Sequence, residues 1–240
     1  MAQQTAHKRR RSKFGRAPKR GDRLYGALDL GTNNCRLLIA RPDGTGFRVV
    51  ASFSRIVRLG EGVSLSGTLI EPAMARTIEA LGICAAKLRD LGVIRSRNIA
   101  TEACRRAANC ETFLARIKAE TGLVFETISF KEEARLALLG CQGLLTAEAP
   151  YALVFDIGGG STELTWARRT DANGYEMVDA MSLPIGVVNL AEQCGRDIDA
   201  ACYAKMVDEI AARIPPFCAR NGIRHALKTA KCRCWALRER

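Results

Sequence analysis

The most informative stretch of this chain is Ala152-Leu153-Val154-Phe155-Asp156-Ile157-Gly158-Gly159-Gly160-Ser161-Thr162-Glu163-Leu164. Its first residues are apolar and include Val and Phe, which predicts a buried strand, and the three successive glycines predict a tight turn. Because glycine has no Cβ, the N–H groups of the turn can approach a phosphate, and the hydroxyls of Ser161 and Thr162 add further donors. The aspartate at the strand end suits a divalent metal, held directly or through water.

A second copy of this pattern lies 127 positions earlier, counted from Asp29 to Asp156. Residues 24–39 repeat its order: an apolar run, Asp, an apolar residue, Gly, small polar residues and a second apolar run. The repetition predicts an internal duplication, with one hairpin turn in each copy. Two such turns facing each other would hold a phosphate chain and its metal from both sides of a cleft.

The positive charge of the chain is concentrated at its two ends. The formal net charge of the 240 residues is +12. Residues 1–23 hold nine Lys/Arg and one Asp, and residues 224–240 hold six Lys/Arg and one Glu, which leaves −1 for the remainder. The nearly neutral body does not indicate specific nucleic-acid binding. We interpret residues 1–22 as a basic disordered tail, with a polyanion-binding arm as the alternative.

The sequence argues against a secreted protein, a membrane-spanning protein and a histidine-based catalytic or zinc site. The amino-terminal segment has no apolar core of a secretory signal, and no run approaches 18 apolar residues, so we expect a cytoplasmic protein that does not span a membrane. The ten cysteines include no CxxC pair, which predicts reduced thiols in the core. With only His7 and His225, a histidine-based zinc site or a Ser-His-Asp triad lacks its residues.

The remainder of the first half predicts helices that present charged side chains. Apolar residues at intervals of three and four predict an amphipathic helix over residues 71–90. Residues 98–101 predict a short strand that opens onto a helix. Arg105 and Arg106 lie just past this junction, where they could contact a phosphate or could form a solvated pair.

Two adjacent glutamates open the next predicted helix. Ser129 and Glu132 have the spacing of a capping box, in which the glutamate binds backbone N–H groups. Glu133 is then left to face a cleft as a general base.

The second half predicts fewer elements than the first. Residues 151–156, 162–168 and 175–182 predict three strands, and residues 197–213 predict a helix that ends before Pro215-Pro216. Residues 224–240 have no clear period, and we interpret them as an atypical basic tail at a truncated or frame-shifted carboxyl terminus. The second sheet would then keep an open strand edge, which predicts low stability.

Five motifs in this order resemble the exopolyphosphatase/guanosine pentaphosphate phosphatase family. They are DLGTNNCR at 29–36, ATEACR at 100–105, EEAR at 132–135, DIGGGSTEL at 156–164 and LPIGV at 183–187. The resemblance covers residues 24–215. It implies an α/β fold with two duplicated actin-like (ribonuclease H-like) domains around a cleft, the first over 23–146 and the second, incomplete, over 147–223.

The resemblance also implies a reaction and a set of site residues. The reaction is Mg²⁺-dependent release of terminal phosphate from polyphosphate or pppGpp, and Glu133 matches the catalytic glutamate that orients and deprotonates the attacking water. The implied metal-binding residues are Asp29, Asp156 and Glu163. The implied phosphate-binding residues are Gly31, Thr32, Asn33, Asn34, Arg36, Arg105, Gly158, Gly159, Gly160, Ser161 and Thr162.

Two other functions remain open at this point. One is a catalytically weak regulatory protein that binds ppGpp or polyphosphate, and the other is a sugar or carboxylate kinase of the same superfamily. The EEAR motif at a helix start argues against the kinase. As partners we expect polyphosphate or a guanosine polyphosphate, no membrane, and a second copy in a longer, homodimeric form.

Overall fold

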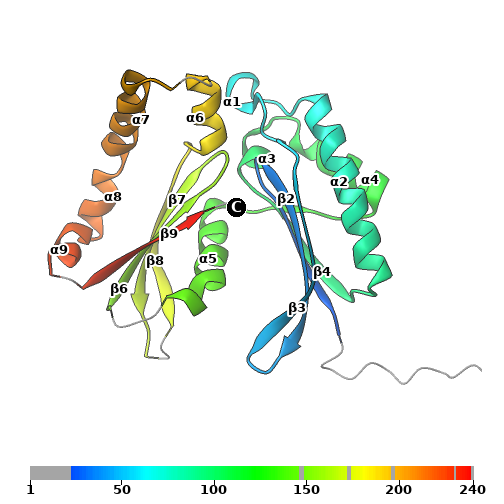
Figure 1. The fold of residues 1–240 in the computed structure, drawn as a ribbon, viewed down its shortest axis with the longest axis horizontal. Helices are drawn as coiled ribbons and strands as arrows, with labels where there is room; N and C mark the ends of the chain where they lie inside the picture. Colours follow the sequence, from blue (N-terminus) through cyan, green and yellow to red (C-terminus); the bar gives the residue numbers. More distant parts are fainter. Residues whose placement is uncertain (1–22, 146–148, 172–173, 196–197, 230, 239–240) are drawn as a thin grey trace, which may run out of the picture.

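The computed structural model describes residues 23–145, 149–171, 174–195, 198–229 and 231–238. These residues form two mixed α/β halves, each built around one sheet (Figure 1). The predicted basic tail at 1–22 lies outside the described residues. No described helix is long and apolar enough to cross a membrane.

The first half is a five-stranded sheet in the order β3-β2-β1-β4-β5. β1 pairs antiparallel with β2 and parallel with β4. The predicted helix over 71–90 is confirmed as α2. The elements are β1 (Tyr25–Leu30), β2 (Asn34–Asp43), β3 (Gly46–Ile56), α1 (Val63–Ser66), α2 (Glu71–Asp90), β4 (Arg95–Ala100), α3 (Glu102–Arg106), α4 (Cys110–Thr121) and β5 (Glu126–Thr127).

The second half is a four-stranded sheet in the order β8-β7-β6-β9. The three predicted strands are confirmed as β6, β7 and β8. The elements are α5 (Phe130–Cys141), the 3₁₀ turn η2 (Gln142–Leu144), β6 (Tyr151–Ile157), β7 (Thr162–Arg169), β8 (Tyr175–Leu183), α6 (Val187–Cys194), α7 (Ala200–Arg213), α8 (Pro215–Arg220), α9 (Ile223–Lys228) and β9 (Cys232–Arg238).

Each sheet buries apolar residues against helices. In the first half, the core joins β1 and β2 to α2 and α4, and Leu30, Leu81 and Ile117 in it are fully buried. In the second half, α8 and α9 cover one face of the sheet through Phe217 and Ile223. α5 covers the other face, on the side of the first half (Figure 1). α5 lies before the predicted domain boundary at 146/147, yet it packs against the second sheet and not the first.

The carboxyl-terminal segment corrects one prediction. Residues 224–240 were expected as an aperiodic tail, but the chain forms α9 and then β9, which pairs parallel with all of β6. The open edge predicted beside β6 is therefore occupied. Cys232 packs in the core on one face of the sheet, whereas Trp235 and Leu237 pack on the other. A strand that is apolar on both faces shows no alternation, which is why its period could not be read.

The duplication extends further than the sequence indicates. The order β3-β2-β1-β4 in the first sheet matches β8-β7-β6-β9 in the second, with the same antiparallel and parallel pairings. β9 is thus the counterpart of β4. Within the described residues, no counterpart of β5 follows it.

Six of the ten cysteines are buried free thiols, as predicted, whereas the free Cys218 is half-buried and the free Cys234 is exposed. The free thiols Cys35, Cys84, Cys104, Cys110, Cys141 and Cys232 are buried. Cys194 and Cys202 instead form a disulfide that joins the end of α6 to the first turn of α7, with their Cα atoms 6.5 Å apart. The prediction of reduced thiols is wrong for this pair, because the end of α6 and the first turn of α7 lie within disulfide-bonding distance.

Candidate active site

The two glycine turns meet between the halves of the molecule. Gly159 lies so close to the first turn that an added Cβ would be 3.2 Å from the Cβ atoms of Thr32 and Asn33. A Cβ on Gly160 would be 2.6 Å from Thr32 Oγ1. A Cβ on Gly160 would force Thr32 to shift, and one on Gly159 would be crowded, because the backbone of one turn packs directly on the side chains of the other.

Backbone hydrogen bonds hold each turn in place. In the first turn, Gly31 N–H donates to the Asn34 carbonyl at 2.9 Å. In the second turn, Gly158 N–H donates to the Ser161 carbonyl at 2.9 Å. Each turn follows a strand that ends at the same edge of its sheet, β1 or β6, so the duplicated topology places both turns at one site.

A cavity of about 70 Å³ lies where the two turns meet. Its lining contains eleven of the residues predicted for the site, together with Thr101 and Glu102. Those two belong to the motif at 100–105, which pointed only to its arginine. The lining residues are Asp29, Gly31, Thr32, Arg36, Thr101, Glu102, Glu133, Asp156, Gly158, Gly159, Gly160, Ser161 and Glu163.

Four predicted phosphate-binding residues do not line this cavity. The Asn33 carbonyl accepts hydrogen bonds from the N–H groups of Val57 and Arg58. Asn34 is buried, and Thr162 Oγ1 donates to the Ile185 carbonyl at 2.7 Å. In this structure these side chains and backbone groups support the turns from outside.

Arg105 is the fourth predicted phosphate-binding residue that does not line the cavity, and acidic side chains hold it. Its guanidinium donates to Glu102 Oε2 at 2.9 Å and to Glu133 Oε2 at 2.6 Å. It also donates to the Ile128 carbonyl at 3.1 Å. Arg105 was predicted to contact phosphate, whereas here it fixes the Glu133 carboxylate beside the cavity.

The adjacent glutamates of α5 have different surroundings. Ser129 caps the helix, as predicted, by accepting a hydrogen bond from Glu132 N–H at 3.2 Å. The reciprocal half of the capping box is not formed, because the Glu132 carboxylate instead accepts hydrogen bonds from Arg135 and Arg97. These bonds hold the pKa of Glu132 at about 2.

Glu133 faces the cavity from the same helix turn. Burial raises the pKa of Glu133, and the charge and hydrogen bond of Arg105 oppose this without reversing it. The nearby charges of Asp156 and Glu102 add to the rise. A carboxylate that is partly desolvated and held by one hydrogen bond can accept a proton more readily than an exposed one.

Glu163 is the most deeply buried acid of the site, at 2% exposure. Burial, followed by the charge of Glu133, raises the pKa of Glu163 to about 7, although hydrogen bonds with Ser182 and Ser161 oppose the shift. Its partner across the β6/β7 pair is Asp156. The lining holds five carboxylates (Asp29, Glu102, Glu133, Asp156 and Glu163) against the single guanidinium of Arg36, so the cavity favours a cation.

The chain matches the Ppx/GppA phosphatase family over residues 38–234. It belongs to that family. A curated relative, the guanosine-5'-triphosphate,3'-diphosphate pyrophosphatase of Photobacterium profundum, is 34% identical over 174 residues. That match covers 72% of this chain and 34% of the relative, so the Ppx/GppA chain described here spans about a third of the relative's length.

Solved Ppx/GppA structures show the same paired actin-like domains. The Aquifex aeolicus PPX-GPPA enzyme matches with a TM-score of 0.66 and 32% identity, over 81% of this chain and 64% of that one. An exopolyphosphatase from Cytophaga hutchinsonii matches with a TM-score of 0.74 and 26% identity, over 81% of this chain and 62% of that one.

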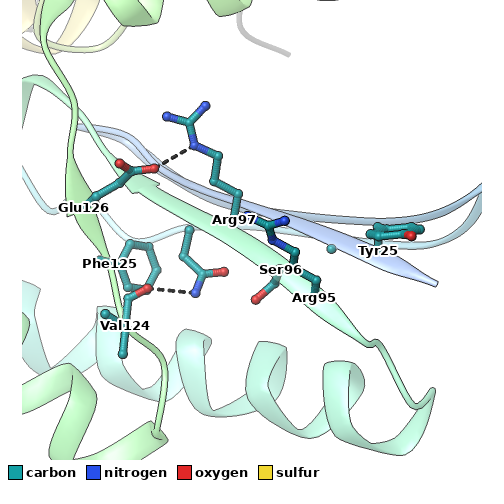
Figure 2. Close-up of a pocket in the computed structure, with 9 residues that line it drawn as sticks. Tyr25, Arg95, Ser96, Arg97, Val124, Phe125 and Glu126 are labelled. Carbon is teal, nitrogen blue, oxygen red and sulfur yellow. Dashed lines mark hydrogen bonds and ion pairs between the residues drawn. The ribbon is translucent and has the colours of Figure 1, made fainter. Parts of the chain in front are cut away.

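A larger pocket of about 660 Å³ lies elsewhere on this Ppx/GppA chain, along residues 95–98 of β4, the part of the strand that does not pair with β5 (Figure 2). Tyr25, Arg95 and Phe125 lie around it, and Arg97 extends to pair with Glu126 at 2.6 Å. Glu126 is the only carboxylate among its lining residues, and this pairing occupies it. The pocket therefore lacks the acidic cluster and glycine turns that distinguish the smaller cavity.

Proposed function

We propose that this chain contributes the catalytic cleft of a phosphoanhydride hydrolase, which releases terminal phosphate from inorganic polyphosphate or pppGpp. The observation that carries the proposal is the position of Glu133. Its carboxylate, held by Arg105, faces a cavity formed by both glycine turns. Family membership and the name of the Photobacterium relative support the choice of reaction.

In the proposed mechanism, Glu133 orients a water molecule for in-line attack on the terminal phosphorus and accepts its proton. The raised pKa of Glu133 suits this role. The bridging P–O bond to the rest of the substrate breaks, so inorganic phosphate is released and the shortened polyphosphate or guanosine polyphosphate leaves with the electron pair of that bond. The backbone N–H groups of Gly159 and Gly160, which line the cavity, bind the equatorial oxygens, where charge increases in the transition state. Arg36 lines the same cavity and balances the charge of the phosphate.

The residues of the site fit a magnesium ion that keeps several water ligands. Asp29, Asp156 and Glu163 provide oxygen atoms on one cavity, but no group of three or more acidic, histidine or cysteine side chains in the described part of the chain could hold a metal by itself. Mg²⁺ keeps several waters and commonly needs only one or two carboxylates together with substrate phosphates. When bound, it would neutralise phosphate oxygens.

The test is phosphate release from three substrates in parallel: long-chain polyphosphate, pppGpp and ATP, each with Mg²⁺ or with a chelator. We expect release from polyphosphate or pppGpp that depends on Mg²⁺. Binding without release would indicate a regulatory protein. ATP consumption that requires a sugar or carboxylate acceptor would indicate a kinase. As part of the same proposal, we place the protein in the cytoplasm.

A further inference from the structure

One carboxylate joins the two halves of the molecule at the outer rim of the cleft. Glu192 of α6 accepts a hydrogen bond from Gly62 N–H at 3.0 Å and another from the Ser64 hydroxyl at 2.8 Å. Gly62 and Ser64 belong to the α1 segment of the first half. α1 and α6 lie next to each other at the top of the molecule (Figure 1).

The helix that carries Glu192 is tied to the second glycine turn. The N–H groups of Val187 and Val188 donate to the carbonyls of Gly158 and Gly159, at 3.1 and 2.8 Å. The buried Asn189 side chain donates to the Gly160 carbonyl at 3.1 Å. α6 and the turn at 158–160 must therefore move together.

The segment that carries Gly62 and Ser64 is tied in the same way to the first turn. Gly60 N–H donates to the Thr32 carbonyl at 2.9 Å, and a Cβ on Gly60 would collide with the Thr32 methyl. Val63 N–H donates to the Gly60 carbonyl at 3.1 Å, which continues the connection into α1. The Glu192 contact thus links two segments that each follow one of the turns.

The cavity between the turns is narrow. Its volume of about 70 Å³ has room for on the order of five water molecules, which is less than a chain of phosphates needs. To hold more of the substrate than its terminal phosphate, the two turns would have to lie further apart.

We propose that Glu192 is a positioning residue that clasps the two halves in the closed arrangement. The proposal rests on the function proposed above, since closure brings Glu133 and both turns around one phosphate. Both hydrogen bonds are exposed to solvent. Exposed polar contacts contribute little individually, so the clasp can open readily, and its loss has an effect of about two- to fivefold.

The experiment compares Glu192→Ala and Ser64→Ala, which remove opposite partners of the same contact. Glu209→Ala is the matched control, because Glu209 lies on the exposed face of α7 and pairs with Arg213 in its own helix. The conformational measurements are the radius of gyration by X-ray scattering and amide hydrogen exchange at residues 31–33 and 158–161. The functional measurement is kcat and KM for polyphosphate or pppGpp.

We expect both clasp variants, and not the control, to have a larger radius of gyration and two- to fivefold faster exchange at both turns. kcat/KM should fall two- to fivefold in each, and the double variant should be no worse than Glu192→Ala alone, because that change already removes both hydrogen bonds. Unchanged scattering and exchange in a folded Ser64→Ala variant would overturn the clasp. If the parent chain hydrolyses nothing but the conformational changes occur, the proposed function fails while the clasp stands.

Discussion

At the scale of single residues, the structure separates neighbours that have the same chemistry. Glu132 and Glu133 are adjacent acids at the start of α5, yet the first pairs with Arg97 and Arg135 outside the cavity and the second lines it. Successive residues of a helix point about 100° apart, so only one of two neighbours can face a given cavity.

Glu133→Gln is expected to abolish phosphate release and to leave substrate affinity nearly unchanged. The amide keeps the size of the side chain but cannot accept the proton of the attacking water. Turnover and equilibrium binding of the same substrate measure the two effects. Glu132→Gln is the control, and it should lose only a small part of the stability that its arginine partners supply. Equal losses of turnover in both variants would contradict the assignment.

Gly160→Ala is expected to reduce activity by more than tenfold. The new Cβ would lie 2.6 Å from Thr32 Oγ1, and Thr32 cannot turn away easily because it is buried and Gly60 packs on its methyl group. Gly82→Ala in α2 is the control, since a Cβ there meets nothing within 4 Å. That change should raise the free energy of unfolding by about 0.5–1 kcal/mol and leave activity intact. Equal activity of both variants would show that the turns need not pack as tightly as here.

At the scale of elements, the strand β9 completes the second sheet. Trp235 and Leu237 pack with the core beneath α5, which joins the last described strand to the helix that carries Glu133. Because β9 pairs with β6, an open β6 edge no longer gives a reason to expect low stability of the second half.

Trp235→Ala is expected to lower the free energy of unfolding by about 2 kcal/mol, because the side chain is partly buried and its removal leaves a cavity. Chemical denaturation followed by circular dichroism measures the change. Arg233→Ala, an exposed position on the same strand, should be nearly neutral. Should the two variants unfold alike, β9 would not contribute to the second sheet as described.

A second contact at this scale ties β8 to the segment around α8, through Asp179. Burial raises the pKa of Asp179, but hydrogen bonds from Arg220 and Asn221 outweigh it and leave the pKa below the ordinary value. A lowered folded-state pKa gives stability that is present above the pKa of the unfolded chain and is lost as the pH falls through the folded one. We expect Asp179→Asn to be less stable than the parent near neutral pH and equally stable at the lowest pH at which both fold. A stability difference that does not change with pH would contradict this.

At the scale of the whole molecule, charge is divided between the ends and the body. Residues 1–23 carry nine Lys/Arg and one Asp, whereas the cavity is acidic. A basic arm and an acidic site would act on different parts of a long polyanion.

Deleting residues 2–22 is expected to flatten the salt dependence of affinity for long-chain polyphosphate. Each lost contact between a basic residue and a phosphate should reduce the slope of log K against log salt by roughly 0.7. Binding titrations between about 50 and 300 mM salt, the range where counterion release is measured, provide the slope. Affinity for pppGpp is the control and should change little. An unchanged slope for polyphosphate would show that residues 2–22 make no contacts with it.

Local sequence patterns predict the duplication, the two glycine turns and most of the residues that line the cavity. These features are local: a strand, an aspartate and a run of small residues specify a turn without reference to the rest of the chain. The choice of Glu133 over Glu132 also followed from local helix capping, although the partner of Glu132 was mistaken.

Tertiary structure alone decided the features that depend on contacts between distant segments. Arg97 and Arg135 determine where the Glu132 carboxylate lies, and Arg105 holds the Glu133 carboxylate. β9 becomes a strand because β6 offers an unpaired edge and both faces of the sheet are covered, and neither condition is visible in residues 232–238. Glu192 reaches Gly62 across 130 residues only because the two halves close on each other. Such contacts depend on how the halves pack, and the sequence pattern of a single segment does not specify that packing.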